Sequence, residues 1–379
     1  MSESRPKILF CMHMPPPVHG AAVVGKQIYD SQLIRDSFDC SFVNYSTSAS
    51  LEEIGRFSLK KIASVFGFIQ QVREKIRNEQ PQIVYITPSL SGWAFYRDYL
   101  MMRMLKRQKC QVIAHFHNKP PVRFTQKWYN KCLYRHFFHG IHTIFLANCL
   151  MEPFKGYIPL KHVHICPNGM PDVATNTEVI RQKIRPYTFL FLSNMMEEKG
   201  VIILLQACAL LKQRGCRFEC NFIGQWSDVT EPRFNALCTE LGLSNNVHAY
   251  GGVYGTEKNV YFQQSDAFVF PTFYPAECLS LVVLEAMQHA LPIITTDEGA
   301  LPEVVDGGCG VVVPRQDNYA LADKMQYLIE HPDVGCAMGK QGRLKYEQEY
   351  TLMTFEHRLT GILENVIKLI SNENNCHVL

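Results

Sequence analysis

Two glutamates eight positions apart, Glu277 and Glu285, are the residues whose type and spacing reveal most about chemistry in this chain. Glu277 lies in a polar stretch with the composition of a loop, and Glu285 lies in an apolar stretch that predicts a helix beginning near Ser280. A carboxylate on an apolar helix is costly to bury unless it has a partner. Since carboxylates accept hydrogen bonds well, we expect that partner to be a ligand rich in hydroxyl groups.

The elements that must position these carboxylates are strands and helices in alternation, a pattern typical of parallel sheets covered by helices. The first half of the chain contains candidate strands at 7–11, 41–45, 83–87, 111–116 and 143–146. The second half contains candidates at 188–193, 218–223, 246–250, 267–270, 292–296 and 310–313. Each half is therefore predicted to be a doubly wound α/β unit. Ligands of such sheets bind at the carboxyl ends of the strands, so two units would face each other across a cleft.

The boundary between the halves is predicted by a stretch dense in Pro, Asn, Gly and Thr at 166–178. Charge changes sign at the same place: residues 1–175 carry 22 Lys and Arg against 11 Asp and Glu, and residues 176–379 carry 16 against 24. Apolar residues at helical spacing between 355 and 370 also predict a final helix. We therefore expect domains at 1–170 and 171–350, followed by a C-terminal helix and tail at 351–379.

Composition excludes several protein classes. With 47% hydrophobic and 19% charged residues the chain is expected to be soluble and globular, since no apolar run reaches the ~20 residues needed to cross a bilayer. The segment 1–10 lacks the apolar core and cleavage site of a signal peptide, which predicts a cytoplasmic protein. The 14 cysteines form no CxxC pair and are expected to be reduced. The last four residues, 376–379, resemble a prenylation box only weakly.

Two further patterns are better explained by structure than by binding. The string Gly20–Lys26 has the first seven positions of a phosphate-binding P-loop, but Gln27 replaces the Ser or Thr that would hold magnesium. His136, His139 and His142 invite a metal site, yet they lie where a helix is predicted to end, and histidines there complement the helix dipole. No metal site is therefore predicted.

The spacing of the two glutamates, and the sequence Leu-Glu-Ala-Met that continues from the second, resembles the E-x7-E motif of retaining glycosyltransferases of family 4. The resemblance covers nearly the whole chain and is strongest from 187 to 313. It implies the GT-B architecture, in which two Rossmann-like domains face a cleft and the C-terminal helix returns to the first domain. It also implies that a nucleotide-diphosphate sugar is the co-substrate, with no metal or other cofactor.

The resemblance gives the two carboxylates separate roles. Glu285 matches the glutamate that accepts hydrogen bonds from the ribose hydroxyls of the donor, and Glu277 matches the one that approaches the donor sugar and its phosphate-linked end. Backbone amides at the start of the helix are expected to point at sugar or diphosphate oxygens. These amides belong to Cys278, Leu279, Ser280 and Leu281.

A second matching segment is 191–200, where a strand runs into a helix. Lys199 matches the family lysine that contacts the diphosphate, a role that suits a compact positive charge. The family arginine that shares this role is absent, because Asn194 occupies its position. We therefore expect either that Asn194 hydrogen-bonds the phosphate or that another basic residue supplies the missing charge.

The first domain contributes two further candidates. His117, after the strand at 111–116, resembles the family histidine that projects beside the donor sugar. His115 would share the same face of that strand, so the sequence leaves the choice between them open. Gly20 lies where the family commonly has a glycine pair that lets the backbone approach the diphosphate or acceptor, and here His19 replaces the other glycine.

The basic first domain is expected to bind the acceptor. Segments 93–109 and 122–138 interleave aromatic, apolar and basic residues, as helices at a membrane interface do. We therefore hypothesise a glycan acceptor linked to a lipid diphosphate, and peripheral contact with an anionic membrane on its inner face.

Three other functions are compatible with parts of the sequence. A GT-B-shaped sugar-nucleotide epimerase would use the carboxylates as acid and base on the donor alone. A non-catalytic homologue that binds nucleotide sugars would account for Asn194 and His19. Nucleic-acid binding would use the basic half, but the acidic second half argues against it.

Overall fold

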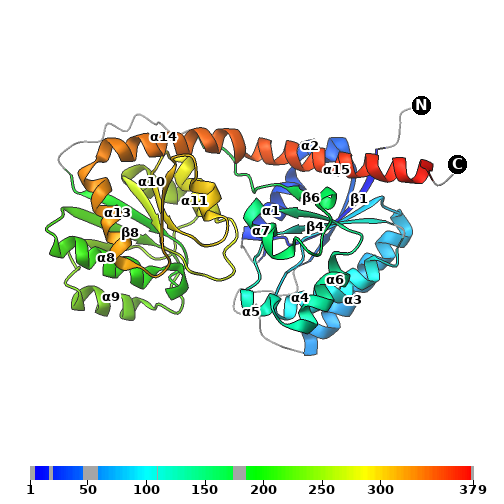
Figure 1. Cartoon of the computed structure of the whole chain (residues 1–379), viewed down its shortest axis with the longest axis horizontal. Helices are drawn as coiled ribbons and strands as arrows, with labels where there is room; N and C mark the ends of the chain where they lie inside the picture. The colour runs from blue at the N-terminus through cyan, green and yellow to red at the C-terminus, as the bar shows by residue number, and fades with distance from the viewer. Residues whose placement is uncertain (1–4, 17–19, 46–58, 109, 174–184, 377–379) are drawn as a thin grey trace. The chain divides into compact units, whose positions relative to one another are not determined.

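The structure is a computed structural model that describes residues 5–16, 20–45, 59–108, 110–173 and 185–376. The chain forms two compact units, one made of Met1–Gly169 with Leu352–Leu379 and the other of Met170–Thr351. Each unit contains one sheet with helices on both of its faces (Figure 1).

The sheet of the first unit has six parallel strands in the order β2-β1-β3-β4-β5-β6. They are β1 (Lys7–Met12), β2 (Asp39–Asn44), β3 (Ile83–Ile86), β4 (Gln111–Phe116), β5 (His142–Phe145) and β6 (Val163–Ile165). The five strands predicted here are confirmed to within two residues at each end. Strand β6 was not predicted, because its three residues are half-buried and include a histidine, so no apolar run marks them.

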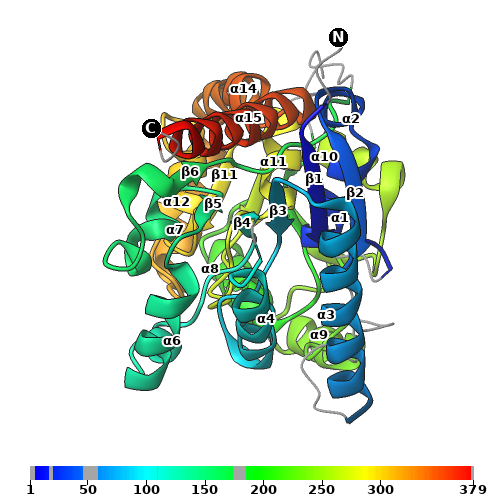
Figure 2. The ribbon, with the colours of Figure 1, turned by 90° about the vertical axis from the view of Figure 1, so that its right-hand side faces the viewer.

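The helices of the first unit cover both faces of its sheet (Figure 2). They are α1 (Gly20–Asp30), α2 (Gln32–Ser37), α3 (Leu59–Glu79), α4 (Gly92–Leu105), α5 (Val122–Thr125), α6 (Trp128–Phe138), α7 (Asn148–Met151), the short 3-10 turns η2 (Glu152–Phe154) and η3 (Leu160–His162), and α15 (Leu352–Cys376). Alternate residues of the strands point to opposite faces. Ile8, Phe10 and Tyr85 pack on the face covered by α1, α2 and α15.

The final helix α15 belongs to the core of the first unit, although it follows the second unit in sequence. Its residues Phe355, Leu359, Leu363 and Val366 are fully buried against the first sheet, and they recur every three or four positions. This spacing is the one from which the helix was predicted, and the prediction is confirmed.

The second unit also has six parallel strands, in the order β12-β11-β10-β7-β8-β9. They are β7 (Tyr187–Leu192), β8 (Phe218–Ile223), β9 (Val247–Ala249), β10 (Ala267–Phe270), β11 (Ile293–Thr296) and β12 (Gly310–Val313). The helices and 3-10 turns are η4 (Glu197–Lys199), α8 (Val201–Gln213), α9 (Glu231–Glu240), η5 (Gly255–Lys258), α10 (Asn259–Gln264), α11 (Leu281–Gln288), α12 (Leu301–Val305), α13 (Asn318–Glu330) and α14 (Pro332–Glu349). All six predicted strands are present, and the predicted fold class of two Rossmann-like α/β domains is confirmed.

Three local features predicted from the sequence can also be compared with the structure. The P-loop-like string at 20–26 lies inside α1, where helical hydrogen bonds occupy most of its amides. The helix predicted to end near the histidines is α6, and Gly140 beyond its end has φ +70°, as a terminating glycine does. Among the described residues, no helix is both long enough and apolar enough to cross a membrane.

Candidate active site

The loop between β10 and α11 carries Glu277 at the carboxyl end of the second sheet, where ligands of such sheets bind. Glu277 is buried, and its Oε2 lies 2.6 Å from Nζ of Lys199. Thr272 places its hydroxyl 3.4 Å from the same oxygen. The carboxylate that the resemblance places near the phosphate-linked end of the donor sugar and the lysine that it places at the diphosphate are therefore in direct contact.

Lys199 is held by aromatic rings as well as by charge. Its Nζ lies 4.5 Å from the centre of the Tyr274 ring and 5.6 Å from that of Phe270. A cation over the face of an aromatic ring is stabilised by the ring's negative face. Burial, with Glu198 and Glu277 nearby, raises the pKa of Tyr274, so this phenol stays neutral beside the lysine. These contacts fix Lys199 at the end of η4.

Two glycines allow the backbone to close around this loop. Gly200, directly after Lys199, has φ +90°, and a Cβ at this position would lie 2.2 Å from the carbonyl oxygen of Pro271. Gly299 has φ +56°, and a Cβ there would lie 2.5 Å from the carbonyl oxygen of Glu277. Both the left-handed backbone and the close approach require glycine. The loop that carries Glu277 is thus in close contact with two glycines, and neither position has room for a side chain.

Glu285 lies on α11, which begins after the N-cap residue Ser280 as predicted. Its side chain is only 8% exposed, and its Oε1 lies 2.5 Å from Nζ of Lys258. Its Oε2 is buried and has no hydrogen-bond partner among the described residues. Burial raises the pKa of Glu285, and Lys258 offsets part of this shift. The carboxylate is therefore paired with Lys258 through Oε1, while Oε2 can still accept a hydrogen bond.

Lys258 is a site residue that the sequence did not suggest. It ends η5, 27 positions before the glutamate that it contacts. No motif or helical spacing links the two residues, so only the folded chain brings them together. The apolar surroundings of Glu285 did predict that a partner must exist.

The amides that the sequence assigned to the donor belong to the first residue of α11, to its N-cap Ser280 and to the two residues before that. The first amides of a helix have no partner inside the helix and carry its positive dipole end. Ser280 makes no capping bond with its side chain. Cys278 and Leu279 are buried, whereas Ser280 and Leu281 are partly exposed.

Asn194 follows β7 and is exposed, so its side chain is accessible at the same end of the sheet as Lys199.

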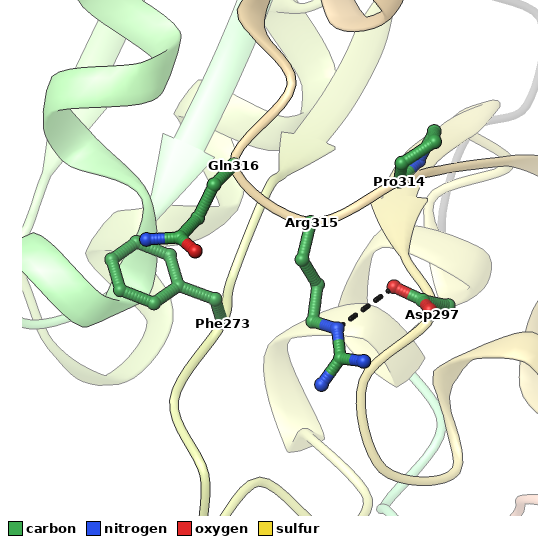
Figure 3. Close-up of a pocket in the computed structure, with 5 residues that line it drawn as sticks. All are labelled: Phe273, Asp297, Pro314, Arg315 and Gln316. Carbon is green, nitrogen blue, oxygen red and sulfur yellow. Dashed lines mark ion pairs between the residues drawn. The ribbon is translucent and has the colours of Figure 1, made fainter.

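A second cation is present at this end of the sheet. Arg315, after β12, lies 3.0 Å from Asp297 and 2.8 Å from the buried Glu298. It lines a cavity of about 440 Å³ with Phe273, Asp297, Pro314 and Gln316, residues that follow β10, β11 and β12 (Figure 3).

In the first unit, His115 and His117 lie at the carboxyl end of β4 with their rings 4.2 Å apart. His115 is fully buried, and its Nδ1 lies 2.6 Å from the hydroxyl of Tyr85. Burial and His117 lower the pKa of His115 far below its ordinary value, so it is a neutral core residue. His117 follows the strand and is partly exposed as a residue, but both of its ring nitrogens are buried.

Gly20 is the first residue of α1 and is exposed, with open space where a Cβ would lie. His19 lies outside the described residues, as do the last three residues of the prenylation-like box and part of the predicted linker. Within the described residues, no group of three or more potential metal ligands was found.

Taken together, the two parallel six-stranded sheets and their flanking helices define an α/β protein with two Rossmann-like domains. The family model described as "Glycosyl transferases group 1" matches residues 142–345, which is more than half of the chain. The protein therefore belongs to the group 1 glycosyl transferase family.

Individual proteins are similar to parts or to the whole of this chain. The D-rhamnosyltransferase WbpZ of Pseudomonas aeruginosa is 31% identical over 187 residues, which are 48% of this chain and 47% of that protein. The amylovoran biosynthesis glycosyltransferase AmsK of Erwinia amylovora is 24% identical over 213 residues, 55% of this chain and 52% of that protein. The chain thus spans about half the length of these curated relatives.

Among solved structures, the sucrose-phosphate synthase of Thermosynechococcus elongatus is similar to almost the whole chain. The TM-score is 0.74, with 96% of this chain and 100% of that one covered, at 15% sequence identity. At this identity the similarity establishes the fold, which is of the GT-B class.

Proposed function

We propose that the protein is a retaining glycosyltransferase of family 4 that transfers a sugar from a nucleotide-diphosphate sugar to a glycan acceptor. The observation that carries this proposal is the carboxylate of Glu285. It is buried, it is paired with Lys258 at one oxygen, and its other oxygen has no partner among the described residues. A ribose hydroxyl of the donor would satisfy that oxygen.

The ion pair between Lys199 and Glu277 supports the second part of the proposal. In the reaction, the bond between the anomeric carbon and the diphosphate oxygen breaks, and a bond from that carbon to the acceptor oxygen forms. The acceptor hydroxyl gives its proton to the departing diphosphate. Lys199 and the first amides of α11 stabilise the charge that develops on this leaving group, and Glu277 orients the transferred sugar.

No metal or other cofactor takes part in the proposed mechanism, because Lys199 supplies the positive charge. Arg315 is the second cation at this end of the sheet, and Asn194 can donate hydrogen bonds to a phosphate oxygen. His117 is assigned to the donor sugar and Gly20 to the backbone approach of the substrates. Full activity in the presence of a chelator is the expected result.

We propose a role in the biosynthesis of a polysaccharide or glycoconjugate, with a glycan on a lipid diphosphate as the acceptor at the cytoplasmic face of the membrane. The basic charge of the first half of the chain, 22 Lys and Arg against 11 Asp and Glu, suits such an anionic acceptor. The similarity to a glycosyltransferase of amylovoran biosynthesis supports the same assignment.

The test begins with a screen of UDP-, GDP- and ADP-sugars for thermal stabilisation, because a ligand that binds the folded state raises its stability, and more so the tighter it binds. The sugar that binds is then incubated with lipid-linked glycan acceptors, and NMR determines the anomeric configuration of the product. Transfer with retention is expected. Inversion would contradict the retaining assignment.

The same incubation distinguishes the alternative functions. Conversion of the nucleotide sugar to an epimer without any acceptor would indicate an epimerase. Binding of a nucleotide sugar without transfer to any acceptor would indicate a non-catalytic homologue.

A further inference from the structure

An exposed face of the first unit combines positive charge with large apolar side chains. We call it the α5–α6 face and define it by Val122, Arg123, Lys127, Trp128, Lys131 and Arg135. The four cations recur every fourth residue, and all four are exposed. Trp128 is 77% exposed and Val122 is 65% exposed. Apolar side chains that are exposed together with cations on one face mark a candidate surface for contact with a membrane or another protein.

No acidic residue close in the sequence neutralises the positive charge of this face. Residues 99–151 contain nine Lys and Arg and no Asp or Glu. None of the four cations of the face forms an ion pair with a described residue, and Lys127 contacts the ring of Tyr129 instead. The face therefore projects an uncompensated positive potential into solvent.

The exposed residues of this face are not part of the core. On the opposite side of α6, Tyr134, Phe137 and Phe138 are fully buried. Asn130 donates a hydrogen bond to the carbonyl of Phe124 at 2.8 Å, which fixes α5 against α6. Because helix residues three or four apart share a face, Trp128 lies on the same side as Lys131 and Arg135.

The neighbouring helix α4 extends this surface. Tyr96 of α4 donates a hydrogen bond to Asn130 of α6 at 3.0 Å, so the two helices lie side by side (Figure 2). Trp93 and Arg103 of α4 and Arg107 just after this helix are also exposed, and Trp93 reaches 67% exposure. The basic and aromatic character is thus continuous over two helices.

We propose that the α5–α6 face docks the protein onto an anionic lipid bilayer, with its cations at the headgroups and Trp128 and Val122 in the interfacial region. Lys and Arg near an anionic bilayer are attracted to it, and Trp is enriched at the boundary between headgroups and chains. Nucleic acid would also attract the cations, but it offers no apolar layer for an exposed aliphatic residue such as Val122.

This inference deepens the proposed function, because docking would bring the enzyme to a lipid-linked acceptor. It does not depend on that function for its test. The probe is a set of vesicles of phosphatidylcholine with phosphatidylglycerol in a 7:3 ratio, compared with vesicles of phosphatidylcholine alone. Co-sedimentation at low and high salt measures the binding of the full chain.

We expect binding to the anionic vesicles, much weaker binding to the neutral ones, and loss of binding at high salt. The variant Lys127→Glu/Lys131→Glu is expected to bind at least about tenfold more weakly, since each surface cation contributes appreciably to such binding. The matched control is Lys324→Glu/Lys340→Glu, which makes the same charge change at exposed residues of the second unit and should bind as the wild type does.

A second variant tests the apolar part of the face. Trp128→Ser keeps the charge and is expected to weaken binding several-fold at every salt concentration, whereas Tyr319→Ser, at a residue 63% exposed in the second unit, should have no effect. Wild-type levels of vesicle binding in both face variants would overturn the proposal. Binding to duplex DNA or RNA without binding to anionic vesicles would also overturn it, and would indicate a nucleic-acid partner.

Nucleotide-sugar binding by the same variants separates this proposal from the proposed function. The face variants should bind the donor as the wild type does. If the protein binds and transfers a sugar in solution but never binds vesicles, docking is wrong and the glycosyltransferase function stands. If it binds vesicles but no nucleotide sugar, the docking proposal stands and the proposed glycosyltransferase function is wrong.

Discussion

At the scale of single residues, the contact between Glu285 and Lys258 decides whether the carboxylate is ionised. Burial raises the pKa of Glu285, and the ammonium 2.5 Å away lowers it again in part. An ionised carboxylate accepts hydrogen bonds from hydroxyl groups better than a protonated one does. Donor affinity should therefore fall as pH falls through the pKa of Glu285.

Lys258→Met should move this loss of affinity to higher pH. Without the ammonium only burial acts on Glu285, so its pKa rises further and the carboxyl is protonated at a higher pH than in the wild type. Calorimetric titration of the donor between pH 5 and 8 measures the shift. Lys258→Arg keeps the charge and should restore most of the wild-type profile. Identical profiles for the wild type and Lys258→Met would show that Lys258 does not tune Glu285.

Lys199→Ala should mainly lower turnover. Removal of one preorganised positive charge at a leaving group commonly costs about 10²–10³ in kcat. The KM for the donor should change less, because much of the donor binding is assigned to Glu285. Steady-state kinetics at saturating acceptor give both values. A thermal melt checks that the protein stays folded when the buried Glu277 loses its lysine partner. A variant with wild-type kcat would remove Lys199 from the mechanism.

At the scale of elements, the turn from η4 into α8 holds Lys199 against the loop of Glu277. Gly200→Ala should destabilise the protein more than Gly215→Ala does. Both glycines have positive φ, +90° and +76°, and a side chain costs about 1–2 kcal/mol there. Only at Gly200 would the new Cβ lie 2.2 Å from a backbone oxygen, since the space around Gly215 is open.

Denaturant unfolding of the two variants isolates this contact, and kinetics show its consequence. Because Gly200 adjoins Lys199, we expect kcat to fall in Gly200→Ala and to be unchanged in Gly215→Ala. Equal stability and equal kcat in the two variants would mean that the close approach does not position the lysine.

Elements were also the level at which sequence reasoning succeeded best. Strand β10 is a continuous apolar run that begins after Asp266 and ends before Pro271, so its ends were predicted to the residue. The helix that carries Glu285 was predicted from its apolar stretch. Strand β6 has no such run and escaped prediction.

Contacts between distant residues were not predictable in the same way. Lys199 and Glu277 are 78 positions apart, and their pairing depends on the order of β7 and β10 in the sheet. The sequence identified both residues through the family resemblance but did not predict the ion pair between them. Lys258 belongs to no motif, so its contact with Glu285 required the folded structure.

At the scale of the whole molecule, the chain returns from the second unit to complete the first. Leu359→Ala on α15 should therefore destabilise the first unit by about 2–5 kcal/mol, the usual cost of truncating a buried leucine. Leu369→Ala on the same helix, at a residue 46% exposed, should cost less than about 1 kcal/mol. Urea unfolding followed by far-UV circular dichroism measures both.

The same pair of variants tests whether the donor site belongs to the second unit. Under conditions in which Leu359→Ala remains folded, its affinity for the nucleotide sugar should equal that of Leu369→Ala. A large loss of donor affinity in the folded Leu359→Ala protein would mean that the core of the first unit shapes the donor site directly.

The central claim is that Glu285 binds the donor, and isothermal titration calorimetry with Glu285→Gln tests it most directly. The matched control is Glu240→Gln, which makes the same change at an exposed residue at the end of α9. With the nucleotide sugar selected by the thermal screen, we expect Glu240→Gln to bind as the wild type does. We expect Glu285→Gln to bind at least about tenfold more weakly while remaining folded, since a hydrogen bond to a charged group is worth about 1.5–3 kcal/mol. Equal affinity in the wild type, Glu240→Gln and Glu285→Gln would contradict the account.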